Sequence, residues 1–407
     1  MHSTIIKPVV NTQRLVNLDV IRGVALLGIL LMNIQVFAMV FSAYGNPTSY
    51  GDLTGINLII YYFSHIFADQ KFMTIFSTLF GVGIILMAEN IESKQGLPKR
   101  VHYKRMFILA VLGLLHAYSL WFGDILFAYA LAGVIVFGAR NKSINFLLVG
   151  AFCLVSICSL MMILSGLSLP YWSAAEFATL QTYWSPTTDL IAQEQLANLG
   201  SWFAQADQRY QMALDMHQNL VFYLPRIVGL MMVGMALYKL GFFANKYNNN
   251  TLMVNGIAAL LLALVIIILG VEYNFSVNWN LEAMFIGSQF NYWGSILMAY
   301  GYLCLLVVFC RARSGQWLKN ALANVGRMAL TNYLLQSLLC GFIFYGWGLG
   351  LFGSAQRWEQ FIMVISIWLL QLILSTWWMN RFQFGLFEWL WRSATYAKVQ
   401  PMVKYKL

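Results

Sequence analysis

The chain has 407 residues, of which 60% are hydrophobic and only 10% are charged, and its mean hydropathy is +0.67. Soluble domains contain roughly 45–50% apolar and about 25% charged residues, so this composition excludes a soluble protein and indicates a polytopic membrane protein. The net charge of +10 does not indicate a nucleic-acid partner, because Lys and Arg gather in short loops between apolar segments.

Ten apolar windows follow one another along the chain, and each is long enough to cross about 30 Å of hydrocarbon as a helix. They lie at about 17–40, 69–88, 105–121, 123–139, 144–166, 220–243, 252–271, 290–310, 321–345 and 358–379. The polar segment 1–14 shows no signal-peptide cleavage site, so we expect an uncleaved first span. The sequence therefore predicts an all-α polytopic membrane protein with about ten transmembrane helices.

Basic residues are distributed unevenly between the loops. Loops 41–56 and 272–289 hold no Lys or Arg, and the long loop 167–219 holds only Arg209. The basic residues outside the spans lie in the other segments: Lys94, Lys99, Arg100, Lys104, Arg105, Arg140, Lys142, Arg311, Arg313, Lys319, Arg381, Arg392, Lys398, Lys404 and Lys406. Because cytoplasmic loops are enriched in Lys and Arg, this asymmetry predicts that both termini are cytoplasmic.

The segment 167–219 is the only sizeable loop between predicted spans. Its apolar residues recur near helical spacing among acidic and amide residues, which predicts amphipathic helices on the outer membrane surface. A lid over a cavity is the alternative interpretation. The chain then divides into an N-terminal membrane half at 1–166, this outer loop, and a C-terminal membrane half at 220–407.

The five cysteines lie inside apolar runs: Cys153, Cys158, Cys304, Cys310 and Cys340. They form no CxxC pair, and no histidine lies near them at the spacing of metal ligands. We interpret them as small core residues and expect no metal site.

The first predicted span carries polar groups that a simple membrane anchor does not need. Asp19 and Arg22 are three residues apart and share a helix face, and Asn33 returns to within about 40° of that face. Burying such groups in hydrocarbon costs several kcal/mol unless they find partners. They are interpreted either as a structural ion pair and an amide contact between helices, or as a functional stripe.

A second polar pair flanks the turn between the third and fourth predicted spans. His116 and Asp124 belong to one tight hairpin, where a carboxylate can orient and polarise an imidazole. We interpret His116 and Asp124 as candidate catalytic residues, with a satisfied core histidine as the alternative.

The predicted topology places the polar residues of the spans at two depths in the membrane. Asn33, His65, Asp69, Lys71, His116, Asp124, Arg226 and Gln336 fall in the outer half, whereas Asp19, Arg22 and Arg327 fall in the inner third. Asn332 and Gln336 are four residues apart and share a face of the ninth predicted span. We expect His116, Asp124 and Asn33, with Lys71 nearby, to line one cavity open to the outside; a lysine that snorkels to the headgroups is the alternative for Lys71.

Several segments carry a resemblance to a known family. "RLVNLDVIRGVALLGILLMNI", "KFMTIFSTLFGVGI", "LHAYSLWFGDILFAYALAGVI", "VGRMALTNYLLQSLLC" and "GLFEWLWR" together resemble the YeiB family of bacterial inner-membrane proteins. The resemblance covers nearly the whole chain in the same order and implies a multi-pass protein of the bacterial inner membrane. Its late-chain region is usually treated as a domain of unknown function.

The opening "LDVIRGVA…MN" more distantly resembles membrane acyltransferases of the heparan-α-glucosaminide acetyltransferase type. This resemblance implies a cytoplasmic acyl-CoA donor and an acceptor on the far side, such as a cell-envelope sugar or lipid. The expected roles are as follows: His116 and Asp124 in catalysis, Asn33, Lys71, Asn332 and Gln336 in substrate binding, and Asp19, Arg22 and Arg327 at the donor. Those enzymes rely on a histidine in the first outer loop, where this chain has Asn46, so His116 or His65 would take its place.

Two other functions remain open at this point. A transporter or exporter of a small amphipathic solute could use the same polar layers as binding site and gate, although no matching pair of short Gly/Pro-interrupted spans supports it. A membrane scaffold with structural polar pairs is the third interpretation. The expected partners are the lipid bilayer and a lipid or sugar acceptor.

The predicted topology can be tested by labelling. We expect a single cysteine placed at Asp189, in a chain otherwise free of cysteine, to react with an impermeant maleimide in intact cells, because the basic residues place loop 167–219 outside. A cysteine at Lys99 is the matched control and should react only after the cells are opened. The opposite labelling pattern would contradict the predicted orientation.

Overall fold

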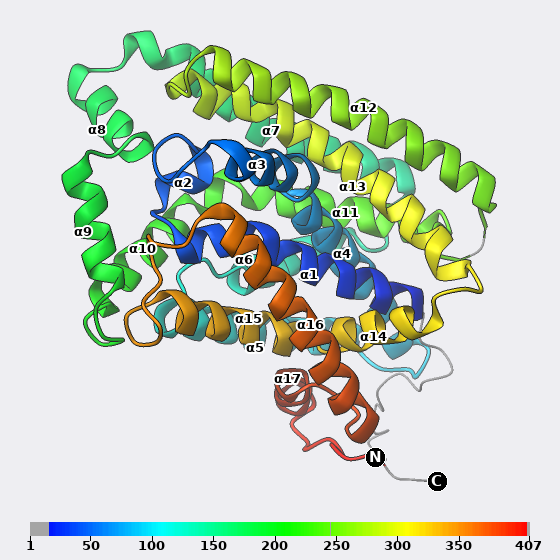
Figure 1. Ribbon diagram of the computed structural model, residues 1–407. Coiled ribbons are helices and arrows are strands. Elements are labelled where there is room, and N and C mark those ends of the chain that lie inside the picture. The colour runs from blue at the N-terminus through cyan, green and yellow to red at the C-terminus, as the bar shows by residue number, and fades with distance from the viewer. Residues whose placement is uncertain (1–15, 245, 405–407) are drawn as a thin grey trace.

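The computed structural model describes residues 16–244 and 246–404, and the described chain is almost entirely helical (Figure 1). The α-helices are α1 Val16–Ala38, α2 Ser42–Gly45, α3 Gly55–Phe67, α4 Lys71–Glu92, α5 Pro98–Ser119, α6 Leu126–Val136, α7 Ile144–Ser168, α8 Ala174–Trp184, α9 Thr188–Asn198, α10 Ala206–Gln218, α11 Leu224–Lys239, α12 Asn249–Ser276, α13 Ser288–Arg311, α14 Gln316–Arg327, α15 Ala329–Phe344, α16 Arg357–Arg381 and α17 Leu386–Tyr396.

Short irregular helices and a single bridge complete the secondary structure of the described ranges. The 3₁₀ segments are η2 Phe137–Ala139, η3 Leu169–Tyr171 and η4 Asn219–Phe222, and η5 Ala283–Gly287 is a π-helix. The β structure of this part of the chain is an isolated bridge between Phe382 and Val403. The predicted all-α class is confirmed, whereas the expected retention of segment 1–14 lies outside the described residues.

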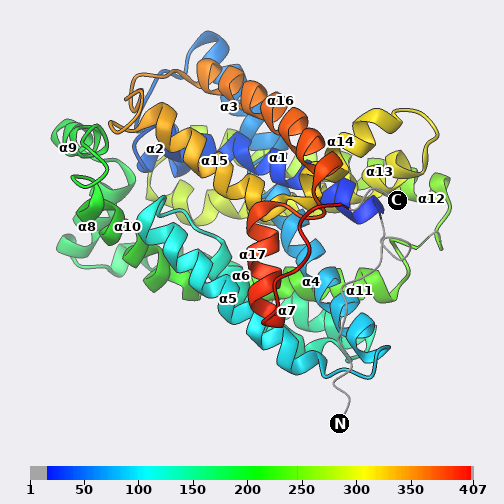
Figure 2. The same cartoon turned by 90° about the horizontal axis from the view of Figure 1, so that it is seen from below.

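Helix α1 lies at the centre of the bundle and is buried along most of its length. It contacts α4, α13, α14, α15 and α16, while α12 packs along α13 and α11 packs against both α4 and α7. Figure 1 shows α12 along the upper edge, α5 and α15 along the lower edge, and α1 between them. Figure 2 shows α17 beside α5 on the lower side. Because α1 contacts α14 and α4 contacts α11, the two predicted membrane halves pack into one body.

Glycines permit the closest helix crossings. A Cβ atom on Gly23 of α1 would lie 2.1 Å from the carbonyl oxygen of Leu322, and one on Gly326 of α14 would lie 1.9 Å from that of Asp19. Helices α4 and α11 cross in the same way at Gly81. Small residues let helix backbones approach in membrane proteins, where packing rather than water exclusion drives association.

The outer helices expose apolar side chains in rows. Large hydrophobic residues that are exposed on α7, α12 and α16 include Val149, Phe152, Leu160, Leu164, Val254, Leu261, Leu262, Val265, Leu269, Ile362, Leu369 and Ile373. Monomeric soluble proteins rarely expose such continuous apolar surface, whereas helices in lipid do. The structure therefore agrees with a multi-pass membrane protein.

The structure contains fewer candidate spans than the ten predicted. In the described ranges, six helical segments are long and apolar enough to cross a membrane, or seven if α10 and α11, which meet at a 61° bend, form one span. The apolar helices in the windows at 123–139 and 321–345 are the shorter Leu126–Ala139 and Ala329–Phe344, and the second window also includes the end of α14.

The window at 105–121 begins inside α5 and runs past its end, and the first half of α5 carries Lys99, Arg100, Lys104 and Arg105. Hydropathy windows detect apolar composition but not helix breaks or flanking charges. For this reason the sequence predicts more membrane spans than the structure contains as candidates.

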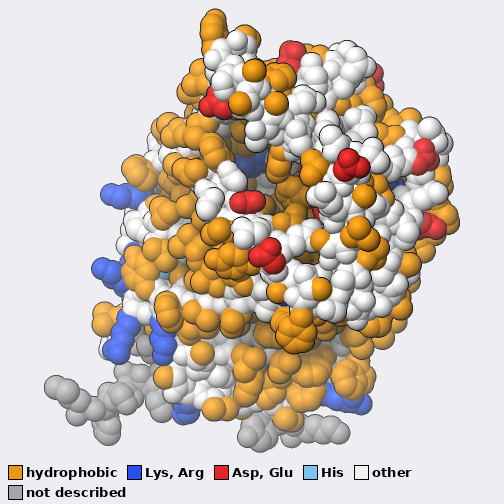
Figure 3. Space-filling view, turned by 90° about the vertical axis from the view of Figure 1, so that its left-hand side faces the viewer, with side chains coloured by type: hydrophobic (Ala, Val, Ile, Leu, Met, Phe, Trp, Pro, Cys, Tyr) orange, Lys and Arg blue, Asp and Glu red, His pale blue; other side chains and the backbone are white. Residues whose placement is uncertain are grey.

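The outer loop predicted at 167–219 forms α8, α9 and α10, which cover one end of the bundle (Figure 1). Arg209 donates from Nε to the carbonyl oxygen of Tyr118 at 2.9 Å, and Glu194 accepts from the backbone N–H of Phe41 at 2.8 Å. Burial raises the pKa of Glu194. Figure 3 views this end, where acidic side chains are spread over a face that is hollowed near its middle. The predicted helices exist, and these contacts hold them against the bundle.

The α1–α14 crossing gives a stability prediction. Gly326→Ala should destabilise the protein by about 1–3 kcal/mol, because the added Cβ would overlap the Asp19 carbonyl and force the helices apart. Gly138→Ala is the matched control, since nothing lies within 4 Å of a Cβ at that position. Thermal unfolding of the detergent-purified variants measures both effects, and equal melting temperatures would contradict the close crossing.

Candidate functional site

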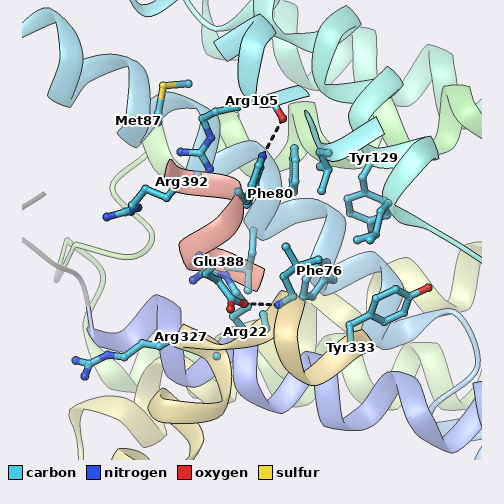
Figure 4. A pocket seen from close by; sticks show the side chains of 18 of the residues that line it. Arg22, Phe76, Phe80, Met87, Arg105, Tyr129, Arg327, Tyr333, Glu388 and Arg392 are labelled. Atoms are coloured by element: carbon cyan, nitrogen blue, oxygen red, sulfur yellow. Dashed lines mark hydrogen bonds between the residues drawn. The ribbon is translucent and has the colours of Figure 1, made fainter. Parts of the chain in front are cut away.

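A cavity of about 260 Å³ lies between α1, α4, α5, α6, α14, α15 and α17. Its polar end is formed by Arg22, Arg105, Arg327, Arg392 and Glu388. Its apolar part is lined by aliphatic and aromatic side chains that include Leu26, Ile29, Phe76, Leu79, Phe80, Tyr129 and Tyr333. Figure 4 shows Arg105, Arg327 and Arg392 on one side of the cavity and Phe76, Tyr129 and Tyr333 on the other.

Asp19 positions two of the arginines at the polar end. Its Oδ1 accepts from Arg22 Nη1 at 2.8 Å, and its Oδ2 lies 3.6 Å from Arg327 Nε. The Asp19 side chain is almost fully buried, whereas both arginines are about one quarter exposed (28% and 26%). The predicted Asp19–Arg22 ion pair is therefore confirmed, and the close α1–α14 crossing adds Arg327 to it.

The other two arginines lie on aromatic rings. The guanidinium carbon of Arg105 is 4.5 Å from the ring centroid of Trp391, and that of Arg392 is 4.6 Å from the ring centroid of Phe384. Contacts of this kind hold a guanidinium in place against the face of the ring. The polar end of the cavity thus presents more cationic than anionic groups.

Helix α17 closes the cavity by capping α15. The Glu388 carboxylate accepts from the backbone N–H groups of Leu330 at 2.6 Å and Thr331 at 3.1 Å, and from the Thr331 hydroxyl at 2.5 Å. Free N–H groups in the first turn of a helix favour such a carboxylate. Burial nevertheless raises the pKa of Glu388. The contacts of Glu388 fix the N-terminus of α15 beside the cavity.

His116 and Asp124 meet as expected, but in a sealed environment. His116 Nδ1 lies 2.8 Å from Asp124 Oδ2, and His116 Nε2 lies 2.9 Å from the hydroxyl oxygen of Ser337 on α15. The other Asp124 oxygen accepts from the Phe127 backbone N–H at 2.8 Å and so caps α6. The side chains of His116 and Asp124 are 1% and 0% exposed.

Lys71 belongs to a different group. It is fully buried, and its ammonium donates to the His65 carbonyl at 2.7 Å and to the Asn291 side-chain oxygen. Asn291 Nδ2 donates to Asp69 Oδ2 at 2.7 Å. Asn33 is part-exposed on α1 and belongs to neither group.

A second, much smaller cavity lies beside Gln35 and Arg357. Neither of these two cavities is lined by His116, Asp124, Asn33 or Lys71. The four residues that were expected to line one outer cavity therefore do not form a single cluster.

Asn332 and Gln336 join α15 to α16. Asn332 Nδ2 donates to the Ser375 hydroxyl at 2.9 Å, and Gln336 Nε2 donates to Gln371 Oε1 at 2.9 Å. Gln371 in turn donates to the Asn332 carbonyl at 2.8 Å. All four side chains are buried, and such amide contacts hold helices together in lipid. These two predicted substrate-binding residues line neither described cavity.

Comparisons with known proteins identify the family. The "Uncharacterized protein YeiB" of Escherichia coli (strain K12) is 30% identical over 403 residues, which cover 96% of this chain and 98% of the relative. The chain belongs to the YeiB family. The "Uncharacterized protein YxaH" of Bacillus subtilis (strain 168) is 28% identical over 415 residues, which cover 98% of each chain.

A family model described as "Protein of unknown function (DUF418)" matches residues 237–398. No solved structure matches the chain. The matched range of this YeiB-family chain contains α12 to α17 and therefore supplies Arg327, Tyr333, Glu388 and Arg392 to the cavity.

Sequence reasoning did not single out Ser337, Arg105 or Arg392. Ser337 is one small polar residue in an apolar helix, and its contact with His116 joins residues 221 positions apart. Arg105 and Arg392 entered the sequence analysis only among the basic residues that predict the orientation of the chain in the membrane. The sequence also missed Arg357, which is buried and donates to Gln35 Oε1 at 3.3 Å.

The ion pair in α1 gives a prediction for a double-mutant cycle. Asp19→Asn and Arg22→Gln should each destabilise the protein, whereas the double variant should lose less than the sum, with a coupling energy of about 0.5–3 kcal/mol. The more exposed pair of Arg140 and Glu92, 3.5 Å apart, is the matched control and should couple by less than about 1 kcal/mol. Unfolding of the purified variants measures both cycles, and additive losses for Asp19 and Arg22 would disprove the coupling.

Proposed function

We propose that the protein binds an acyl-CoA in the α1–α17 cavity and transfers its acyl group to a cell-envelope sugar or lipid on the far side of the membrane. The observation that supports this most directly is the division of one cavity into an arginine-rich end and an apolar interior. Guanidinium groups bind phosphates through paired N–H donors, and the aliphatic and aromatic interior suits the less polar part of the same ligand.

The roles follow from the positions of the residues. Arg22, Arg105, Arg327 and Arg392 bind the phosphates of the donor, and Asp19 keeps two of them in place. His116, oriented by Asp124, is the general base, and it lies behind Tyr333 at the apolar part of the cavity.

The proposed orientation has both termini in the cytoplasm of a bacterium, and the arginine end of the cavity then faces the cytoplasmic acyl-CoA. Under this orientation the acceptor approaches from the end covered by α8, α9 and α10. A transporter of amphipathic anions would use the same cavity without breaking the thioester. Release of free CoA therefore separates transfer from transport.

Donor binding can be tested with palmitoyl-CoA and the detergent-purified protein. Arg392→Gln should weaken binding about tenfold or more, because a charge-assisted hydrogen bond to phosphate contributes about 1.5–3 kcal/mol. Arg381→Gln is the matched control: Arg381 also lies over an aromatic ring, 4.4 Å from the Trp377 centroid, but does not line the cavity. Calorimetric titration measures both affinities, and equal affinities for the two variants would contradict this binding site.

A further inference from the structure

We propose that Ser337 is the nucleophile of the transfer reaction and carries the acyl group as an ester, with His116 as its base and Asp124 as the orienting carboxylate. This inference rests on the proposed function and adds a covalent intermediate, a second catalytic side chain and a gate at Tyr333. It also assigns a role to a serine that no comparison singles out.

The three side chains have the hydrogen-bond order of a Ser–His–Asp triad. Asp124 Oδ2 lies 2.8 Å from His116 Nδ1, and His116 Nε2 lies 2.9 Å from Ser337 Oγ. A carboxylate can only accept, so in the neutral imidazole Nδ1 carries the hydrogen and Nε2 is the acceptor for the Ser337 hydroxyl. Triads are recognised by this geometry and by these roles rather than by the order of the residues along the chain.

The hydroxyl oxygen of Ser337 lies closer to His116 than to the nearest carbonyl of its own helix. Other serines and threonines in this chain donate to the carbonyl four residues earlier at 2.8–3.0 Å, as Ser77, Thr78 and Ser366 do. The corresponding distance from Ser337 Oγ to the Tyr333 carbonyl is 3.4 Å, whereas that to His116 is 2.9 Å. A purely local helix contact does not explain this preference, whereas a hydrogen bond to a base does.

Tyr333 separates the triad from the cavity. Its side chain lines the cavity, and Ser337 lies one turn further along the same face of α15, at a rise of roughly 6 Å. The rings of Tyr333 and His116 have centroids 5.1 Å apart. The Tyr333 hydroxyl accepts from the Ile125 backbone N–H and donates to the Gly123 carbonyl, each at 3.3 Å.

Both of these hydrogen bonds are longer than the usual value for their type, so they hold the tyrosine ring weakly. Rotation of the Tyr333 side chain would connect the apolar end of the cavity with Ser337. The sealed triad would then be the closed state, in which water cannot reach the ester.

The reaction balances in two steps. In the first, Ser337 Oγ forms a bond to the thioester carbonyl carbon and the carbon–sulfur bond breaks. The hydroxyl proton passes to His116 Nε2 and from there to the sulfur, which gives acylated Ser337 and free CoA. In the second, an acceptor hydroxyl attacks the ester, its proton returns through His116 to Ser337 Oγ, and the acylated acceptor leaves.

The test uses radiolabelled palmitoyl-CoA and the full-length purified protein without acceptor. After denaturation, label should remain on the peptide that contains Ser337 and should resist neutral hydroxylamine, as an oxygen ester does. Ser337→Ala should lose at least about 90% of this label while binding palmitoyl-CoA as tightly as the wild type. Ser366→Ala is the matched control and should label normally, since Ser366 is an exposed serine of α16.

Two further variants keep the test decisive if Ser337→Ala does not fold. Ser337→Cys should form a thioester, which makes the label sensitive to hydroxylamine. Tyr333→Phe removes both hydrogen bonds of the gate and should increase the labelling rate several-fold, a gain that a misfolded protein cannot show. A Tyr333→Phe rate at or below that of the wild type would overturn the gate.

The outcomes distinguish this proposal from the proposed function. If the wild type binds palmitoyl-CoA and releases CoA with an added envelope-lipid extract, and Ser337→Ala does so equally, Ser337 is not the nucleophile although the acyltransferase activity stands. Hydroxylamine-sensitive label on the wild type would indicate a cysteine, such as the nearby Cys340, and would also overturn the proposal. A wild type that does not bind palmitoyl-CoA would overturn the donor site and the triad together.

Discussion

The contact of one carboxylate with two guanidinium groups organises the arginine-rich end of the cavity. Asp19 reaches Arg22 on its own helix and Arg327 on α14, and it can do so because Gly23 and Gly326 bring the two backbones together. A buried carboxylate without such partners would be strongly unfavourable in a membrane protein. The ion pairs and the glycine crossing therefore depend on each other, and together they fix the α1 and α14 sides of the cavity.

The charged groups around that cavity are held in place by different kinds of partner. Asp19 lies between two arginines, Glu388 is engaged by the N-terminus of α15, and Arg105 and Arg392 are held on aromatic rings. Clefts lined by one sign of charge with low-dielectric walls concentrate the opposite charge. Under the proposed function, this arrangement would attract an anionic ligand before any specific contact is made, and the apolar interior would then select anions with a long uncharged portion.

Local spacing explains which features could be predicted from the sequence. The Asp19–Arg22 pair follows from a separation of three residues in a helix, and the His116–Asp124 pair follows from a tight hairpin. The contacts of Arg327 with Asp19 and of Ser337 with His116 depend on how distant helices pack, which neither periodicity nor hydropathy encodes. The predicted depth of a residue in the membrane also did not show which residues lie close together. Lys71 and His116 were both expected in the outer half, yet they belong to separate hydrogen-bonded groups.

The capping of α15 by Glu388 has a consequence for the synthesis of the protein. Helix α17 is the last helix of the described chain, yet it supplies both the carboxylate that anchors α15 and part of the cavity wall. The earlier helices can enter the bilayer as they leave the ribosome, but the cavity has no closed wall until α17 emerges. Under the proposed function, the ligand could therefore bind only after α17 has been made, and a product truncated before Leu386 would occupy the membrane without this wall of the cavity.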